Sequence, residues 1–416
     1  MSNTILIPGL LMSQHTPSDL AALLRQCANP DMETGKPRMT PSEDLRKRLY
    51  NILIEMEQSC TKFANGFAIG SLCIPLCSTQ DIQTITCHSF QSTKEAVFSA
   101  EWHDTKLVFK SATSYVNVLH WYDNGELKYP SERDFLYTVK AIVKNKINMN
   151  ISHDTAQKLA RLKPSYQEIN LSKRRREMDN LWVLLQDNEY LLSALYAERD
   201  IFPQLLGTCG TYFAVEFVEP IESSPTTFLS ISDNRKEWGR RLKIALLILE
   251  LLDELETGFH EPYHLCDIKL EHFGLTKSGN KVKFLDLVSV YSKSIVGAII
   301  RQIGACQKDE DCEYLDCRGK CEKKTRQCST IVNNNNFQIV CEKIFLGWRM
   351  SNTILIPGLL MSQHTPSDLA ALLRQCANPD METGKPRMTP SEDLRKRLYN
   401  ILIEMEQSVN EDIFLK

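Results

Sequence analysis

The middle of the chain shows short apolar patterns of the kind that form β-strands. From Val97 to Ser111, apolar and polar residues alternate with a period near two, and His103-Asp104-Thr105 interrupts the alternation. This pattern predicts a hairpin whose second strand closes with Lys110. Further strands are predicted at Leu205 to Leu206, Tyr212 to Val218 and Val282 to Leu285, and Asp286 follows the last of them.

Longer segments between these strands have the periodicity of helices. They are Glu132 to Asn148, Asp179 to Glu198 and Trp238 to Leu255. The second is strongly amphipathic and carries Glu189, and the third is apolar enough to be buried. After it comes the chemically richest stretch, His264 to Leu275, with the sequence HLCDIKLEHFGL. Its Asp267 lies among apolar residues, where an unpaired carboxylate would be costly.

One segment of the chain occurs twice. Residues 1–59 recur without change as residues 350–408. Solenoid repeats are adjacent and shorter, so this is a copied segment that we expect to displace the authentic N-terminus. Each copy has the pattern of an amphipathic helix pair, for which packing on a larger core is favoured over a membrane-surface role. One core offers one docking place, so we expect residues 1–59 not to be integral to the fold.

Composition and charge exclude some partners. The chain has 416 residues, of which 43% are hydrophobic and 24% charged, as in an ordinary globular protein of two or three domains. Lysine and arginine number 49 against 52 acidic residues, a net charge of -3. No basic field attracts nucleic acid, which is therefore not an expected partner.

Met1 to Leu20 lacks the pattern of a signal peptide, and no stretch is apolar enough to span a bilayer.

The 14 cysteines are clustered. The two groups are Cys60, Cys73, Cys77 and Cys87, and then Cys306, Cys312, Cys317, Cys321, Cys328 and Cys341. The C-x2-C spacing of structural zinc sites is absent, which favours disulfides over zinc and over unlinked structural thiols. Because both groups have even numbers of members, we expect most pairs to form within each group. Disulfides indicate an oxidising compartment.

The order of these elements is that of a protein kinase. In that chemistry, a strand lysine neutralises nucleotide phosphates and is held by a helix carboxylate, while one aspartate orients the acceptor hydroxyl and another ligates magnesium. The corresponding residues are Lys110 with Glu189, then Asp267 with its neighbour Lys269, and the metal ligand Asp286. The sequence therefore predicts an α+β, bilobal protein-kinase-like fold.

Several motifs resemble the divergent protein kinase domain family 1, a cysteine-rich group of kinase-like proteins. They are HLCDIK at residues 264–269, CQKDEDCEYLDCRGKC at residues 306–321, VNNN at residues 332–335 and CEKIF at residues 341–345. The resemblance covers about Cys60 to Ser408. It implies a protein on the lumenal side of the endoplasmic reticulum membrane, held by an N-terminal signal anchor that this chain lacks. It also implies ATP with Mg²⁺ or Mn²⁺ as cofactors, and a protein partner or substrate in the secretory pathway.

The resemblance and the patterns together suggest a division of the chain. We expect the copied segment at 1–59, a cysteine-rich segment at 60–90 and a kinase-like N-lobe at 91–220. A kinase-like C-lobe at 221–348 should follow, with a cysteine-rich insert at 306–341, and then a C-terminal helical extension at 349–416.

The sequence also departs from the kinase pattern. No glycine lies between Ser89 and Trp102, where a glycine-rich loop would close over the phosphates. His272 stands where kinases place an asparagine that binds a second magnesium, and imidazole suits zinc or copper better. Asp286 is followed by Leu287-Val288 instead of Phe-Gly. These departures weaken the expected grip on phosphate and metal.

Calcium is not an expected cofactor. The family resembles EF-hand proteins in an insertion, yet Lys163 to Glu177 has no D-x-D-x-D-G pattern. Asp309, Glu310, Asp311 and Asp316 lack a glycine at the sixth loop position, which favours a solvated acidic loop between disulfides.

Three functional hypotheses follow. The first is a weak ATP-dependent phosphotransferase that uses Lys110, Glu189, Asp267 and Asp286. The second is a catalytically inactive pseudokinase that acts as a binding scaffold, favoured by the missing glycines and by His272. The third, a secreted disulfide-stapled interaction module, fits the cysteines but not the order from Lys110 to Asp286.

Overall fold

The fold is known from a computed structural model that describes residues 56–79, 81–87, 97–112, 119–162, 170–221, 234–350, 353–378 and 389–414. The chain forms two compact units. The first takes residues 1–131, 163–190 and 204–217, and the second takes 132–162, 191–203 and 218–416. Within residues 91–220, three segments group with the second unit, namely 132–162, 191–203 and 218–220.

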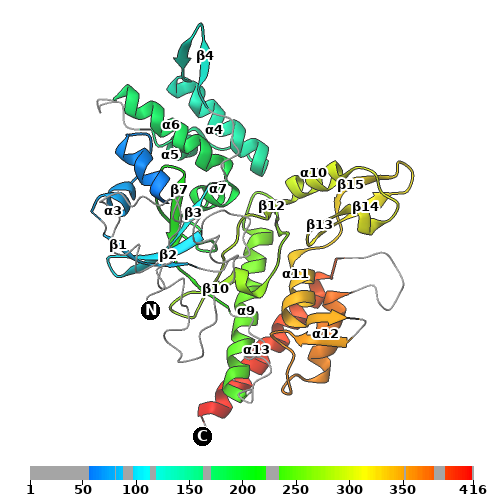
Figure 1. Cartoon of the computed structure of the whole chain (residues 1–416). Coiled ribbons are helices and arrows are strands. Elements are labelled where there is room, and N and C mark those ends of the chain that lie inside the picture. The colour runs from blue at the N-terminus through cyan, green and yellow to red at the C-terminus, as the bar shows by residue number, and fades with distance from the viewer. Residues whose placement is uncertain are drawn as a thin grey trace, which may run out of the picture. The chain divides into compact units, whose positions relative to one another are not determined.

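The first unit is built on an antiparallel sheet of five strands in the order β1-β2-β3-β7-β6 (Figure 1). They are β1 (Ile82–Cys87), β2 (Val97–Trp102), β3 (Thr105–Ser111), β6 (Leu205–Cys209) and β7 (Tyr212–Glu216). The predicted hairpin is β2-β3, and His103 and Asp104 turn it with positive φ angles of 46° and 61°. Period-two alternation buries Leu107 and Phe109 and leaves Lys110 on the opposite face.

Short helices and two disulfides cover this sheet. Residues 56–64 are helical and include Cys60, which is bonded to Cys77 at the end of α3 (Cys73–Cys77). Cys73 is bonded to Cys209 of β6. The backbone approaches so closely there that a Cβ at Gly70 would overlap the Thr208 carbonyl. Ser59 is buried, so the expected boundary at residue 59 falls inside a packed helix.

The described part of the first unit also contains a hairpin, α6 and the start of α7. The hairpin joins β4 (Trp121–Asp123) to β5 (Glu126–Lys128), and α6 spans Leu171–Gln186. The single helix expected from Asp179 to Glu198 is wrong, because α6 ends at Gln186 and α7 (Asn188–Leu195) begins after Asp187. Asp187 has extended backbone angles, and its Oδ1 accepts the N–H of Tyr190 at 3.0 Å. An aspartate that caps a new helix in this way ends the previous one.

The second unit is centred on the apolar helix α9 (Arg235–Thr257), which the sequence predicts as Trp238 to Leu255. Asn234 caps it by accepting the N–H of Glu237. The same unit contains α4 (Glu132–Ile147), α5 (His153–Leu159), β8 (Glu219–Pro220), β9 (Tyr263–Leu265), β10 (Phe273–Leu275), β11 (Val282–Phe284) and β12 (Val290–Ser292). The last strands form the small sheets β11-β10-β8 and β12-β9. Ser292 Oγ donates to the carbonyl of Ile147, which ties α4 to this unit.

A cysteine-rich insert follows β12 in the second unit (Figure 1). Between β12 and the insert lies α10 (Lys293–Ile303), and the insert itself contains the sheet of β13 (Glu313–Tyr314), β14 (Cys317–Glu322) and β15 (Gln327–Val332). A Cβ at Gly297 would overlap the carbonyl of Thr330, so a glycine is needed where α10 meets β15.

The C-terminal copy of the repeated segment is part of the second unit. After α11 (Asn336–Ile339) and a π-helical segment (Val340–Phe345), β16 (Gly347–Met350) pairs with β17 (Thr353–Pro357). Then come α12 (Ser367–Ala377) and α13 (Glu392–Phe414), which confirm a C-terminal helical extension. Figure 1 shows α13 beside α9, and Arg395 binds Glu256 of α9 at 2.7 Å. Residues 1–55 lie outside the described residues.

Six disulfides occur among the described residues, which confirms the disulfide-rich fold. Three join cysteines of the same group: Cys60–Cys77, Cys306–Cys321 and Cys312–Cys328. The expectation of pairing within groups is wrong for the other three: Cys73–Cys209, Cys266–Cys317 and Cys341–Cys376. Proximity in sequence misleads because a folded chain brings distant cysteines together. The side chain of Cys87 lies outside the described residues.

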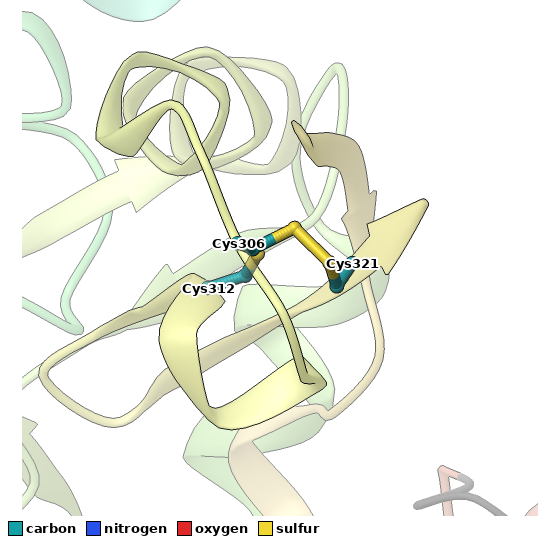
Figure 2. A group of neighbouring side chains, drawn as sticks. All are labelled: Cys306, Cys312 and Cys321. Carbon is teal, nitrogen blue, oxygen red and sulfur yellow. A yellow bond between two sulfur atoms is a disulfide. The ribbon is translucent and has the colours of Figure 1, made fainter. Parts of the chain in front are cut away.

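Three sulfur atoms lie close together in the insert. Cys306, Cys312 and Cys321 lie close enough to resemble a metal site, and all three are buried. Figure 2 shows the disulfide between Cys306 and Cys321. The third cysteine, Cys312, is bonded to Cys328. The cluster is therefore two adjacent disulfides. Its sulfurs do not provide the thiolates that zinc requires.

Candidate functional site

The first unit holds a buried ion pair between a strand and a helix. Lys110 Nζ of β3 lies 2.6 Å from Glu189 Oε1 in the first turn of α7. Their side chains are 14% and 3% exposed. Breaking such a pair by removing one partner typically costs about 3–5 kcal/mol, because a charge is left buried and uncompensated. The pair is the one predicted from the sequence.

Glu189 is held in place by the start of α7. Asp187 caps this helix, and the Tyr190 ring packs edge-on against Phe213 of β7 with centroids 5.6 Å apart. In register, Phe213 lies opposite Lys110 across the β3-β7 pair. The helix start is thus fixed on the strand beside the one that carries the lysine, which places the carboxylate within reach of Nζ.

The second unit holds the loop that contains Asp267. This loop leaves β9 and passes through a 3-10 turn (Leu270–His272) into β10. Lys269 Nζ lies 2.9 Å from Asp267 Oδ2. Burial alone would lower the pKa of Lys269, but Asp267, Glu271 and Asp286 together raise it above its usual value. Lys269 therefore stays cationic and holds one oxygen of the Asp267 carboxylate.

Asp267 is also part of a compact group with His272 and Asp286. One ligand atom from each lies within 4.8 Å of those of the others. Nδ1 of His272 is 3.0 Å from the carbonyl oxygen of Asp267, and its Nε2 is 3.5 Å from Asp286 Oδ2. Asp286 follows β11, and its Oδ1 accepts the N–H of Val288 at 3.1 Å. The order of elements in the sequence predicted roles for Asp267 and Asp286, and the structure brings both into one group with His272, which the sequence analysis treats as a departure from the kinase pattern.

The Asp267 loop is fastened to the cysteine-rich insert, which sequence reasoning missed. Asp316 Oδ2 accepts the N–H of Ile268 at 2.7 Å, and the N–H of Asp316 donates to the carbonyl of Cys266 at 2.8 Å. The next residue, Cys317, is bonded to Cys266. The two neighbours of Asp267 are thus held by two consecutive residues of the insert, which restrains the backbone on both sides of the carboxylate.

A second fastening holds the strand before the loop. Asn336 Oδ1 accepts the N–H of Leu265 at 2.8 Å, and its Nδ2 donates to the carbonyl of Tyr263 at 2.7 Å. Asn336 is buried, and these two bonds to the β9 backbone satisfy its side-chain amide. The run of asparagines at residues 333–336 was the sequence signal for this contact, because buried side-chain amides need hydrogen-bond partners.

The sequence predicts that the acidic residues of the insert form a solvated loop. In the structure, several of them also accept hydrogen bonds from the backbone. Asp311 Oδ2 accepts the N–H groups of Gln307 and Lys308, and Asp309 Oδ1 accepts that of Cys321. Together with Asp316 they act as acceptors that shape the backbone. In the segment Lys163 to Glu177, residues 163–169 lie outside the described residues, and Glu177 pairs with Arg174 at 2.9 Å.

Comparison with known families agrees with this arrangement. Residues 181–379 match a family model described as the protein-kinase domain of FAM69, and residues 49–162 match one described as the N-terminal cysteine-rich ER region of FAM69. The chain belongs to the FAM69 family. This confirms the resemblance to a divergent, cysteine-rich kinase-like family and the kinase-like fold. In the part of this FAM69 chain that the structure describes, no helix has the length and apolarity needed to cross a membrane.

Proposed function

We propose that this chain is a nucleotide-binding, kinase-like protein of the endoplasmic reticulum lumen and a slow ATP-dependent phosphotransferase. The observation that carries the proposal is the 2.6 Å pair between Lys110 and Glu189. A buried pair adds little net stability, because the desolvation of both charges offsets their attraction. Its use is chemical: a lysine held by a carboxylate is positioned to neutralise nucleotide phosphates.

Each site residue has a role in this proposal. Lys110 binds the phosphates, and Glu189 fixes the position of its Nζ. Asp267 accepts a hydrogen bond from the acceptor hydroxyl and orients it, while Lys269 holds the carboxylate by its Oδ2. The restraints from Asp316 and Cys317 keep this carboxylate from swinging with the loop.

Asp286 fits a divalent metal, since a carboxylate is the oxygen ligand that Mg²⁺ and Mn²⁺ prefer. A bound metal would neutralise charge that develops on the transferring phosphoryl group. His272 offers a nitrogen in place of the amide oxygen that kinases use, and residues 88–96 contain no glycine for a phosphate loop. Both features weaken catalysis, and so we propose slow transfer.

The lumenal location rests on the disulfides and on the family description. Six disulfides are stable in an oxidising compartment and rare in the cytosol. The family description of the N-terminal region names the ER. A protein partner or substrate in the secretory pathway is the matching proposal for the acceptor.

A pseudokinase scaffold is the second candidate. It is favoured by the imidazole of His272 at the second metal position, which would leave the charge on bound nucleotide partly uncompensated. In that case the folded site would bind a protein partner without turnover.

A thermal-shift titration with ATP and Mg²⁺ or Mn²⁺ tests the proposal. A ligand at one hundred times its dissociation constant stabilises the folded state by about 2.7 kcal/mol, which raises the melting temperature by several degrees. The double variant Lys110→Met with Glu189→Gln removes the phosphate-binding charge without leaving a buried carboxylate, and should lose this shift. Lys106→Met, on the same strand with its Nζ stacked over Phe217 at 3.7 Å, is the matched control and should keep it. A wild type without any shift would contradict nucleotide binding and favour the scaffold.

A further inference from the structure

The proton on His272 is assigned by its surroundings. Nδ1 lies 3.0 Å from the Asp267 carbonyl, which can only accept, so Nδ1 carries the hydrogen. In the neutral ring, Nε2 then presents a lone pair to Asp286 Oδ2 at 3.5 Å. Two acceptors that face each other repel unless a cation lies between them. A backbone carbonyl that holds the other ring nitrogen is also how proteins orient a histidine that ligates a metal.

Another histidine of the same unit shows the contrast. His260 Nε2 also lies 3.5 Å from a carboxylate oxygen, that of Glu261. There, however, Nε2 is 3.2 Å from the carbonyl of Ile147, so the nitrogen that faces the carboxylate carries the hydrogen. His260 and Glu261 thus form an ordinary donor and acceptor pair, whereas His272 uses its Nδ1–H on the Asp267 carbonyl and turns Nε2 toward Asp286, where this nitrogen can ligate a cation.

Asp267 supplies a third ligand atom. Its carboxylate lies within 4.8 Å of the ligand atoms of His272 and Asp286. Lys269 holds Oδ2, so Oδ1 is the oxygen available to a metal. All three residues are partly shielded from solvent, which strengthens their attraction for a cation.

We infer that Asp267, His272 and Asp286 form one site that binds a borderline divalent cation, of the Mn²⁺ or Zn²⁺ class, in preference to Mg²⁺. One imidazole and two carboxylates are a donor set that first-row transition ions accept readily, whereas Mg²⁺ strongly prefers oxygen. The inference deepens the proposed function, on which it rests for the use of the metal. With Asp267 engaged as a ligand, its use as acceptor for the substrate hydroxyl is reduced, which agrees with slow transfer.

Electron paramagnetic resonance of Mn²⁺ tests the site without nucleotide. Titration of the purified full chain with MnCl₂ should show about one tightly bound ion, and the bound ion should show ¹⁴N modulation from the imidazole in pulsed spectra. His272→Asn should abolish the nitrogen modulation and weaken Mn²⁺ binding about tenfold or more. His260→Asn, the matched control, should change neither. Mg²⁺ should displace Mn²⁺ from the wild type only in large excess, and this excess should shrink in His272→Asn.

The wild-type spectrum decides the matter even if a variant fails to fold. Bound Mn²⁺ without nitrogen modulation, or no bound Mn²⁺, would overturn the inference and leave His272 and Asp286 as an imidazolium–carboxylate pair. This test of the metal site is independent of the test of nucleotide binding. Nitrogen modulation with no thermal shift from ATP would support this site and contradict nucleotide binding, and the converse result would contradict the site alone.

Discussion

Replacement of Asp316 by alanine should loosen the Asp267 loop. The substitution removes the acceptor of the Ile268 N–H and leaves that buried group without its 2.7 Å partner. Hydrogen bonds to charged groups contribute about 1.5–3 kcal/mol. The ion pair of Asp316 with Lys343 at 2.8 Å adds about 0–1 kcal/mol, because the lysine side chain is 37% exposed. We therefore expect a loss of about 1.5–4 kcal/mol in the free energy of unfolding of the second unit.

Urea unfolding with the disulfides intact measures this loss, and Mn²⁺ affinity measures its effect on the site. Asp309→Ala is the matched control, because Asp309 also accepts a backbone N–H, that of Cys321, at 2.8 Å. Both variants should lose stability, but only Asp316→Ala should weaken Mn²⁺ binding, by about tenfold. Asp316→Asn keeps an acceptor oxygen and should restore most of the affinity. Equal Mn²⁺ affinities in Asp316→Ala and Asp309→Ala would refute the role of Asp316 in positioning the loop.

Three further outcomes are expected. Burial, with Lys293 as a second cause, lowers the pKa of His264 from 6.5 to about 4, so the unfolded state binds the extra proton first as the pH falls. The free energy of unfolding should therefore be at its full value above about pH 6.5 and fall by about 3 kcal/mol toward pH 4. Melting temperatures measured over this pH range test it, and an equal dependence on pH in His264→Gln and in the wild type would contradict it. Deletion of residues 1–55 should leave the melting temperature unchanged, and a shift of several degrees would show that the first copy is integral. In the second copy, Cys376→Ser opens the bridge to Cys341 and should lower the free energy of unfolding by about 2–4 kcal/mol. With Mg²⁺ as the only metal, His272→Asn should raise phosphotransfer in a radiolabel assay about tenfold, and a fast wild type would show that His272 is no impediment.

Much of the fold could be predicted because its signals are local. The period-two pattern from Val97 to Ser111 corresponds to β2 and β3, and the apolar run at Trp238 to Leu255 lies within α9. The break between α6 and α7 could not be predicted from apolar periodicity, which continues through it. A single side chain, Asp187, decides that break by capping the second helix.

The candidate residues of each unit could be proposed from the sequence where a single residue type carries the chemistry. Lys110, Glu189, Asp267 and Asp286 follow the order of elements that phosphotransfer requires. The role of Asp316 could not be predicted, because Asp316 acts through a backbone N–H that is 48 residues away in sequence. The partners Cys209, Cys266 and Cys376 were missed for the same reason, since pairing depends on distances in the folded chain.

Calorimetric titration of ATP in the presence of MnCl₂ tests the central claim most directly. Asp286 is the carboxylate on which metal-dependent nucleotide binding depends in this account. The wild type should bind one nucleotide per chain, and Asp286→Asn should abolish metal-dependent binding while its unfolding transition persists. Absence of binding in the wild type, or unchanged affinity in Asp286→Asn, would contradict the account.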